Sequence, residues 1–316
     1  MQRILVTGGA GFIGSNLSKK LLNDNYEIIC LDNFDSFYSR NQKELNLKNL
    51  KDKKNFKLIE GDIRNEEDLK EIEGIDIIIH LAAKTGVRPS IHQPDLYYDV
   101  NVKGTQNLLE FARQQNIKQF IFASSSSVYG INKNVPWKED EILLPISPYA
   151  STKLACEMLG HVYHHLYEIR FLALRFFTAY GPSQRPDLAI HKFFKSILNN
   201  NPIPVFGDGS TSRDYTFVDD IVNGIVSAIS YTASNYEIIN LGNHQSVTLK
   251  ELINAIEEIS GRKAIINRLP EQQGDVSETY ADISKAKSLL NYHPQTPLKD
   301  GLTSFYNWYV ENANNI

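Results

Sequence analysis

Cysteine is scarce in this sequence. Cys30 and Cys156 are the two cysteines among 316 residues, the first in an apolar strand-like run and the second in a helix-like one. Two thiols cannot build the disulfide framework that stabilises small secreted domains, so a disulfide scaffold is disfavoured. Both side chains are expected to pack as small buried hydrophobes rather than to act as nucleophiles.

Long apolar runs and dense basic runs are also missing. No apolar stretch approaches the ~18 residues that a membrane span requires. The chain opens on a strand-like run, Arg3–Thr7, without a charged leader, so no secretory signal is expected. The formal net charge is −4, and the basic stretch Lys51–Lys54 is shorter than the basic stripe of nucleic-acid-binding proteins. We therefore expect a cytoplasmic protein that binds neither membranes nor nucleic acid.

Strand-like and helix-like segments alternate through the first 180 residues. The strand candidates are Ile4–Thr7, Glu27–Leu31, Phe56–Ile59, Ile75–His80, Gln119–Ala123 and Arg170–Phe176. The helix candidates between them are Phe12–Leu22, Asn65–Ile72, Leu96–Gln115 and Tyr149–Leu166. Nearly continuous apolar strands are typical of a parallel sheet that is buried on both faces. The pattern predicts a Rossmann-type, doubly wound α/β domain over residues 1–180.

The character of the sequence changes after about residue 180. Glycine and proline cluster there, and helix-like stretches dominate: Ala189–Leu198, Val218–Ile229, Thr248–Ile259 and Pro297–Val310. One strand candidate, Tyr236–Leu241, is expected to rejoin the sheet. Residues 181–316 are therefore predicted to form a smaller, mostly helical lobe that binds the substrate at the carboxyl edge of the sheet.

A glycine-rich turn follows the first strand and opens the first helix, with the sequence Thr7-Gly8-Gly9-Ala10-Gly11-Phe12-Ile13-Gly14. Gly8 permits the tight turn, Gly11 lets backbone N–H groups approach a pyrophosphate, and Gly14 lets helix and strand pack closely. The anion would lie at the positive end of the helix that Phe12 and Ile13 begin. The turn therefore predicts a dinucleotide site.

The end of the second strand carries Asp32 and Asn33, about 20 residues further on. An acidic side chain there can accept hydrogen bonds from the adenosine ribose and repels a 2′-phosphate, which favours NAD over NADP. Asp62 and Ile63 follow the third strand, where Asp62 could bind the adenine amino group or simply cap a helix.

The fourth strand ends in Leu81-Ala82-Ala83. The small side chains there would let the cofactor lie close to the backbone, or they reflect tight packing alone.

Tyr149 and Lys153 are spaced i and i+4 and would share one face of a helix. Hydride transfer at a carbinol carbon needs a base for the hydroxyl proton. A nearby ammonium, reinforced by the charge of the nicotinamide, can lower a tyrosine pKa from about 10 toward neutrality. Ser125, Ser126 and Ser127 end the fifth strand, where a hydroxyl can hydrogen-bond the reacting oxygen, unless the serines are satisfied by local backbone bonds.

Taken together, these motifs resemble those of the extended short-chain dehydrogenase/reductases, in the NAD-dependent sugar-nucleotide epimerase/dehydratase group. The residues that carry the resemblance are Gly8, Gly11, Gly14, Asp32, Asp62, Leu81–Ala83, Asn101, Gly104, Asn107, Val128–Gly130, Ser147–Tyr149, Lys153, Arg175–Phe177, Gly181-Pro182, Arg213–Tyr215, Val218–Asp220 and Gly274-Asp275. The resemblance implies that Tyr149 is the base, Ser125 assists it, and Lys153 binds the nicotinamide ribose. It also places Asn101 in the cofactor site, and it implies that Arg213 and Asp275 contact the nucleotide diphosphate and its ribose.

Members of this group oxidise C4 of the sugar and then diverge. A 4,6-dehydratase has an Asp-Glu pair after the catalytic hydroxyl residue, whereas this chain has Ser126 and Ser127, so dehydration is disfavoured. The segments Thr85–Ser90 and Arg175–Ala189 resemble those of UDP-glucuronate 4-epimerases, including Thr178. Arg88 and Arg185 suit a sugar carboxylate, although either could instead contact diphosphate or form a surface salt bridge.

The expected reaction is therefore the interconversion of UDP-glucuronate and UDP-galacturonate with bound NAD and no metal ion. UDP-glucose 4-epimerase, UDP-glucuronate decarboxylase and, from another class, a regulatory NAD-binding protein remain as alternatives. The resemblance also implies a homodimer that packs the Leu96–Gln115 and Tyr149–Leu166 helices into a four-helix bundle.

Overall fold

The computed structural model describes residues 1–270 and 276–314. Its centre is a parallel sheet of seven strands in the order β10-β6-β5-β4-β1-β2-β3. The strands are β1 (Arg3–Thr7), β2 (Glu27–Asp32), β3 (Phe56–Glu60), β4 (Ile77–His80), β5 (Gln119–Ser125), β6 (Arg170–Phe176) and β10 (Tyr236–Leu241). The strand order reverses between β1 and β4, which is where such sheets bind ligands. The predicted Rossmann-type fold class is confirmed.

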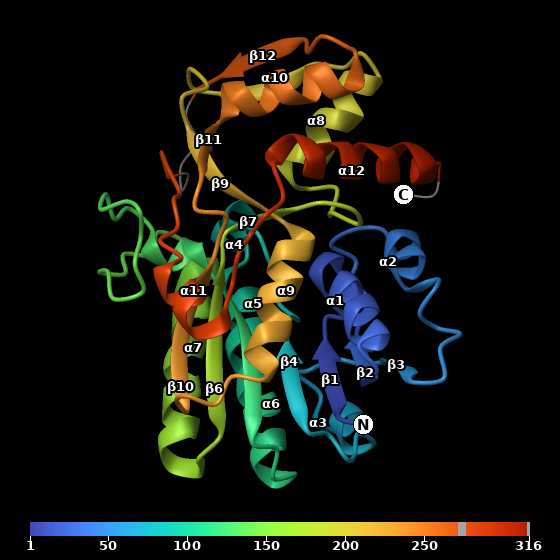
Figure 1. Ribbon diagram of the computed structural model, residues 1–316, viewed down its shortest axis with the longest axis vertical. Helices are drawn as coiled ribbons and strands as arrows, with labels where there is room; N and C mark the ends of the chain where they lie inside the picture. Colours follow the sequence, from blue (N-terminus) through green and yellow to red (C-terminus); the bar gives the residue numbers. More distant parts are fainter. Residues whose placement is uncertain (271–275, 315–316) are drawn as a thin grey trace.

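Helices cover both faces of the sheet (Figure 1). On one face, α1 (Phe12–Asn23) packs against α9 (Val218–Ile229), and on the other α6 (Gly104–Gln114) packs against α7 (Pro148–Tyr167). The shorter helices of this part are α2 (Arg40–Leu47), α3 (Glu66–Lys70), α4 (Val87–His92), α5 (Pro94–Tyr97) and α11 (Ser284–Leu290). Within the part of the chain that the structure describes, no helix is long and apolar enough to cross a membrane.

The two-sided cover explains the continuous apolar strands. Neighbouring residues of a strand point to opposite faces, and Ile78 and Ile79 of β4, both fully buried, belong to different hydrophobic clusters. The cluster of Ile79 includes the α1 and α9 side chains, and that of Ile78 includes side chains from α6 and α7. A strand in this position needs an apolar residue at every step.

The second lobe lies over the carboxyl ends of the strands (Figure 1). Its helices are α8 (Ala189–Leu198), α10 (Leu249–Ser260) and α12 (Leu298–Asn312). It also contains two small sheets that the sequence pattern did not predict. One joins β7 (Thr178–Tyr180), β9 (Ser212–Phe217) and β11 (Ser246–Thr248), and the other joins β8 (Ile203–Phe206) and β12 (Ile266–Leu269).

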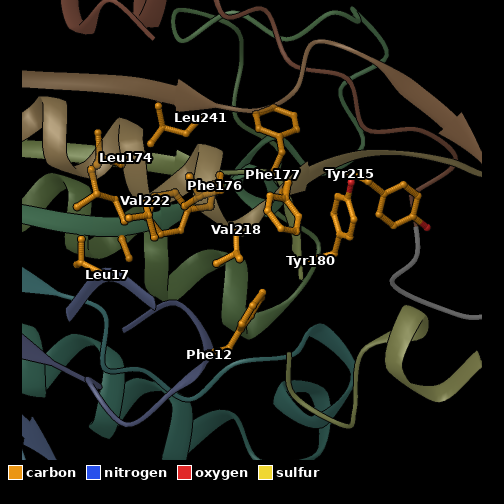
Figure 2. Packing of buried hydrophobic residues seen from close by; sticks show 14 of the residues in the cluster. Phe12, Leu17, Leu174, Phe176, Phe177, Tyr180, Tyr215, Val218, Val222 and Leu241 are labelled. Carbon is orange, nitrogen blue, oxygen red and sulfur yellow. The ribbon is translucent and has the colours of Figure 1, made fainter. Parts of the chain in front are cut away.

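One hydrophobic cluster joins the lobe to the large sheet. Figure 2 shows Phe12 at the start of α1, Phe176 at the end of β6 and Val218 at the start of α9 converging on it. Tyr180 of β7 and Tyr215 of β9 continue the same cluster into the lobe. The large sheet and the lobe thus share one hydrophobic core.

The predicted helix Leu96–Gln115 is interrupted. After α5 the chain widens into a π-helical segment, Tyr98–Lys103, before α6 begins. At this widened turn, the carbonyl of Asn101 accepts hydrogen bonds from the Thr105 hydroxyl and the Cys156 thiol. Side-chain donors of this kind compete with regular helical hydrogen bonds, and such π-helical turns are frequent at functional sites.

Candidate functional site

A cavity of about 470 Å³ lies between the carboxyl ends of the strands and the second lobe. This volume is in the range of small-molecule and cofactor sites. The cavity brings together many of the residues predicted from the sequence: Gly8, Gly11, Phe12, Ile13, Gly14, Asp32, Asn33, Asp62, Ile63, Leu81, Ala82, Ala83, Ser125, Ser126, Ser127, Tyr149, Lys153, Thr178 and Arg185.

The glycine-rich turn is packed too closely for side chains. Gly8 has φ +69°, and a Cβ there would lie 2.8 Å from the Cα and N atoms of Ala82. A Cβ at Gly14 would lie 2.3 Å from the carbonyl oxygen of Gly8. Gly11 is the N-cap of α1 and provides no side-chain hydrogen bond to the helix. The first turn of α1, which the structure describes in full, contains no acidic residue. The geometry fits a dinucleotide pyrophosphate bound at the helix N-terminus.

Asp32 is held in a fixed orientation at the end of β2. Its carboxylate accepts hydrogen bonds from the backbone N–H of Ala10 at 3.0 Å and of Phe34 at 2.8 Å. The ammonium of Lys43, also buried, lies 3.6 Å from Asp32 Oδ1, the oxygen that also accepts from Phe34. Asp32 therefore presents a fixed acceptor where an adenosine ribose would lie, and Lys43 partly balances its charge.

Asp62 is bound by protein groups. Arg64 donates to it from Nε at 3.0 Å and Nη2 at 2.8 Å, and Asn33 donates from Nδ2 at 2.9 Å. The hydrogen bonds from Arg64 lower the pKa of Asp62 to about 2. Helix α3 is capped by Asn65, which accepts from the N–H of Glu67, so the alternative that Asp62 caps this helix is wrong.

Tyr149 and Lys153 lie in the first turns of α7. Ser147 caps this helix by accepting from the N–H of Ala150, and Pro148 occupies its first position. Lys153 donates to the carbonyl oxygen of Ala123 at 2.7 Å, and burial lowers its pKa to about 8. The cap therefore fixes both side chains at the end of β5.

Burial raises the pKa of Tyr149 above its usual value, while a hydrogen bond with Ser125 and the charge of Arg185 act to lower it. Lys153 lies farther off, its Nζ 6.0 Å from the centroid of the Tyr149 ring. Among the protein's own groups, Ser125 and Arg185, rather than the expected Lys153, therefore act to lower the pKa of Tyr149. An oxidised nicotinamide would supply a further positive charge when bound.

Ser125 is oriented as a donor. Its hydroxyl oxygen accepts hydrogen bonds from the N–H of Ser127 at 3.2 Å and from the Ser127 hydroxyl at 2.9 Å. With these acceptor positions used, the Ser125 proton points elsewhere, toward Tyr149 or a substrate oxygen. A local backbone bond, the alternative for these serines, is therefore present at Ser125, whose oxygen accepts from the Ser127 N–H, but it leaves the Ser125 proton available.

A buried ionic network, not predicted from the sequence, lies beneath these residues. Arg175 donates from Nε at 2.9 Å and Nη2 at 2.8 Å to the carboxylate of Glu157, and both are at most 1% exposed. Ser124 donates to the same carboxylate at 2.5 Å, and Tyr129 accepts from Arg175 at 3.0 Å. The network joins β5, β6 and α7, the elements that carry Ser125 and Tyr149.

Arg185 faces the cavity beside Thr178. Its Nε and Nη2 atoms each donate to the carboxylate of Asp187 at 3.0 Å, and Nη1 donates to the Thr85 hydroxyl. The salt bridge that was an alternative for Arg185 therefore exists, and Arg185 also lines the cavity.

Comparisons with known proteins show which family the chain belongs to. A family model described as GDP-mannose 4,6 dehydratase matches residues 5–305. The chain belongs to this family. It is a family of extended short-chain dehydrogenase/reductases, so the resemblance inferred from the motifs is confirmed.

Individual members of the family are similar over nearly the whole chain. A UDP-glucuronate 4-epimerase of Thermodesulfobacterium geofontis is 41% identical over 98% of this chain and 96% of its own length. The crystal structure of UDP-glucuronic acid 4-epimerase from Bacillus cereus, in complex with UDP-glucuronic acid and NAD, is 40% identical, with a TM-score of 0.92 over 98% of this chain and 99% of that one. UDP-glucose 4-epimerase from Thermotoga maritima, with UDP-glucose, is 32% identical, with a TM-score of 0.91 over 99% and 100% of the two chains.

Some family positions predicted to bind ligands lie elsewhere. Arg88 and Arg213 are not among the described residues that line the cavity: the Arg88 guanidinium lies 5.1 Å from the centroid of the Phe206 ring, and Arg213 donates to the Ser212 carbonyl at 2.8 Å. Their substrate contacts stay predictions. Asp275 lies outside the described residues.

Asn101 also lies behind the cavity wall. Its side chain accepts from the N–H of Lys84, donates to the carbonyl of Lys84 and donates to the Thr152 hydroxyl. These bonds join the loop after β4 to α7. Asn101 is not among the described residues that line the cavity, and its contact with the cofactor stays a prediction.

Several residues that line the cavity of this protein were not predicted from its sequence. They are Asp35, Phe37, Tyr38, Lys43 and Lys84. Most lie in the segment after β2, whose polar sequence gives no apolar pattern, and they reach the cavity through tertiary packing. Lys84 lies between the predicted Ala83 and the segment Thr85–Ser90, so reading the two motifs as continuous would have found it.

Proposed function

We propose that this protein is an NAD-dependent UDP-glucuronate 4-epimerase. The observation that carries the proposal is the placement of a cation, Arg185, in the same cavity as the Tyr149–Ser125 pair and the glycine-rich turn. The turn is suited to NAD, Tyr149 to proton transfer, and Arg185 to an anionic substituent of the sugar. The similarity to epimerases that bind UDP-glucuronic acid and NAD supports the same assignment.

In the proposed reaction, Tyr149 accepts the proton of the C4 hydroxyl, and Ser125 donates a hydrogen bond to the oxygen that becomes a ketone. Bound NAD accepts the hydride from C4 and later returns it. The 4-keto sugar rotates in the cavity, so that the hydride returns to the opposite face of C4 while Tyr149 gives the proton back. The cycle is redox-neutral and leaves the cofactor as it began.

A uronate substrate needs a further restraint. Its 4-keto intermediate is a β-keto acid, which loses CO₂ when the bond to the carboxylate aligns with the ketone π system. We propose that Arg185 and Thr178 hold the carboxylate out of this alignment. Ser126 and Ser127 provide no acid–base pair for elimination, in agreement with epimerisation rather than dehydration.

One observation supports a second candidate, UDP-glucose 4-epimerase. Asp187 already occupies the Nε and Nη2 atoms of Arg185, so the cation is partly neutralised in the absence of any sugar carboxylate. A neutral hexose would fit this arrangement. The structural similarity to UDP-glucose 4-epimerase from Thermotoga maritima points the same way.

The test is to incubate the purified protein with UDP-glucuronate or UDP-glucose, without added NAD, and to follow products by NMR. We expect UDP-galacturonate from the first sugar, little product from the second, and no CO₂. Preferential turnover of UDP-glucose would replace the proposed function with the second candidate. The release of CO₂ with formation of a pentose would indicate a decarboxylase.

We also propose that the chain works as a homodimer. Met158, Val162 and Leu166 follow one another at every fourth position of α7 and are 49%, 45% and 59% exposed. Such a stripe suits the four-helix bundle expected from α6 and α7 of two copies. Light scattering should give a dimer mass for the wild type, and Val162→Glu should give a monomer.

The lobe of residues 181–316 is proposed to bind mainly the UDP-sugar, and residues 1–180 mainly NAD. A cytosolic location is proposed as well, because the two cysteines are buried thiols that need no oxidising compartment. Cell fractionation with an antibody to the protein would test the location.

A further inference from the structure

The segment between β2 and α2 borders the cavity with Asp35, Phe37 and Tyr38. The hydroxyl of Tyr38 is buried and has no hydrogen-bond partner among the described residues. A buried polar group without a partner is costly, and such groups in native proteins call for an explanation, often a ligand. This hydroxyl is a candidate contact for whatever fills the cavity.

The position of the hydroxyl indicates which part of a ligand it would meet. A Cβ on Gly11 would lie 3.9 Å from the Tyr38 oxygen, so the hydroxyl is beside the start of α1. The uncapped N–H groups of α1 and the Tyr38 hydroxyl are thus hydrogen-bond donors at the same end of the cavity. Donors that converge on a helix N-terminus favour an anion.

The charges around Tyr38 keep it protonated. Burial, Asp32 and Asp187 raise the pKa of Tyr38, and Arg185 lowers it by a smaller amount than burial raises it. The Lys43 ammonium lies 5.0 Å from the centroid of the ring. At neutral pH the group is therefore a neutral donor, which can bind a phosphate oxygen without adding repulsion.

The segment around Tyr38 is attached at both borders of the cavity. Asp35 forms a salt bridge with Lys84 at 2.8 Å. In α2, Gln42 donates to the carbonyl of Gln184 at 3.0 Å and Asn46 donates to the carbonyl of Ala10 at 3.0 Å. These contacts join it to the loop after β4, to the second lobe and to the glycine-rich turn.

We propose that Tyr38 donates a hydrogen bond to the pyrophosphate of NAD and that the β2–α2 segment retains the cofactor between turnovers. This inference rests on the proposed function, in which NAD is regenerated in each cycle and has no need to leave. A retaining contact on the pyrophosphate serves such a cycle, whereas a net dehydrogenase must release its cofactor.

The experiment compares the wild type with Tyr38→Phe, which removes only the hydroxyl oxygen. Tyr26→Phe is the matched control, because Tyr26 is half-buried and is not among the described residues that line the cavity. Protein stripped of nucleotide is titrated by calorimetry with NAD, with ADP-ribose, which keeps the pyrophosphate, and with adenosine, which lacks it. Thermal melting of the stripped proteins checks that each variant folds.

We expect Tyr38→Phe to weaken NAD and ADP-ribose alike, by about 10- to 100-fold, as for loss of a hydrogen bond to a charged group. Adenosine binding and the Tyr26→Phe control should be unchanged, and NAD should dissociate faster from the Tyr38 variant in a chase. Unchanged affinity for ADP-ribose, or an equal loss for adenosine, would overturn the role of Tyr38. Failure of the wild type to bind NAD at all would overturn the proposed function itself.

Discussion

Replacement of Arg185 by alanine separates the two candidate substrates most sharply. In the proposed function its guanidinium binds the sugar carboxylate, a charge-assisted interaction of about 1.5–3 kcal/mol. The structure adds a second effect. Asp187 is held by Arg185 through two hydrogen bonds of 3.0 Å, so the variant leaves the Asp187 carboxylate without this partner and close to the substrate carboxylate.

Repulsion between two carboxylates about 4 Å apart is about 1 kcal/mol in a water-like medium. The side chain of Asp187 is 29% exposed, which supports a value near this solvated limit. The two effects together amount to about 2.5–4 kcal/mol, or a ~50- to 1000-fold fall in kcat/KM for UDP-glucuronate. Activity on UDP-glucose, which has no carboxylate, should fall by a smaller factor, because there the variant loses only the Arg185 charge that acts to lower the pKa of Tyr149.

The double variant Arg185→Ala/Asp187→Asn is the control. It removes the repulsion and should recover about fivefold of the loss on UDP-glucuronate, with no recovery on UDP-glucose. Initial rates on both sugars, measured by coupled NMR or chromatography together with trapped CO₂, give the comparison. Release of CO₂ by the single variant would agree with a carboxylate that rotates freely. Equal losses on both sugars, with no recovery in the double variant, would refute the carboxylate role of Arg185.

Three further predictions concern the remaining groups. Tyr149→Phe should retain less than a tenth of the wild-type rate while NAD binding is unchanged. The wild-type rate should rise from pH 6 to 9, because burial raises the pKa of Tyr149 and the side chain must lose its proton to act as the base. A rate that does not change with pH would contradict this assignment. Asp32→Asn keeps a hydrogen-bond acceptor but removes the charge, so it should narrow the preference for NAD over NADP by about tenfold in binding titrations. Equal binding of NAD and NADP by the wild type would contradict the role of Asp32. Glu157→Gln should lower the free energy of unfolding by about 3 kcal/mol, because Arg175 loses its buried counter-charge. Asp24→Asn, in a more exposed pair, should change the free energy of unfolding by less than about 1 kcal/mol. Equal losses for the two variants in denaturant titrations would count against the role of burial.

The α/β part of the chain, residues 1–180, was predictable because its signals are local. A strand buried on both faces is apolar at successive positions, as at Ile77, Ile78 and Ile79 of β4, and a helix that packs on a sheet keeps an apolar stripe. Helix α2, with the polar sequence of Arg40–Leu47, has neither signal, and its place is set by hydrogen bonds such as that of Gln42 to the second lobe. The short strands of the lobe were missed for a related reason, since strands of a few residues such as Ser246–Thr248 carry too little periodicity.

The site shows the same division. The glycine-rich turn and the Tyr149/Lys153 pair were recognisable because their geometry is set within a few residues of sequence. Lys43, in contrast, acts on Asp32 through a contact that only the folded chain creates. Arg88 shows the opposite difficulty: its residue type suits a carboxylate, but its position over the Phe206 ring depends on how the lobe packs.

The edge strand β10 has a consequence for engineering this protein. The chain leaves the sheet after β6, builds part of the lobe, and returns to add β10 beside β6 before it completes the lobe. Asn240 of β10 also binds the Tyr129 hydroxyl at 2.7 Å, so this late segment supports the ionic network under the site. A fragment that stops at residue 180 would leave β6 as an unprotected edge, open to pairing with other chains. Chimaeras that exchange the second lobe between relatives would therefore need two junctions, one on each side of β10, rather than a single cut.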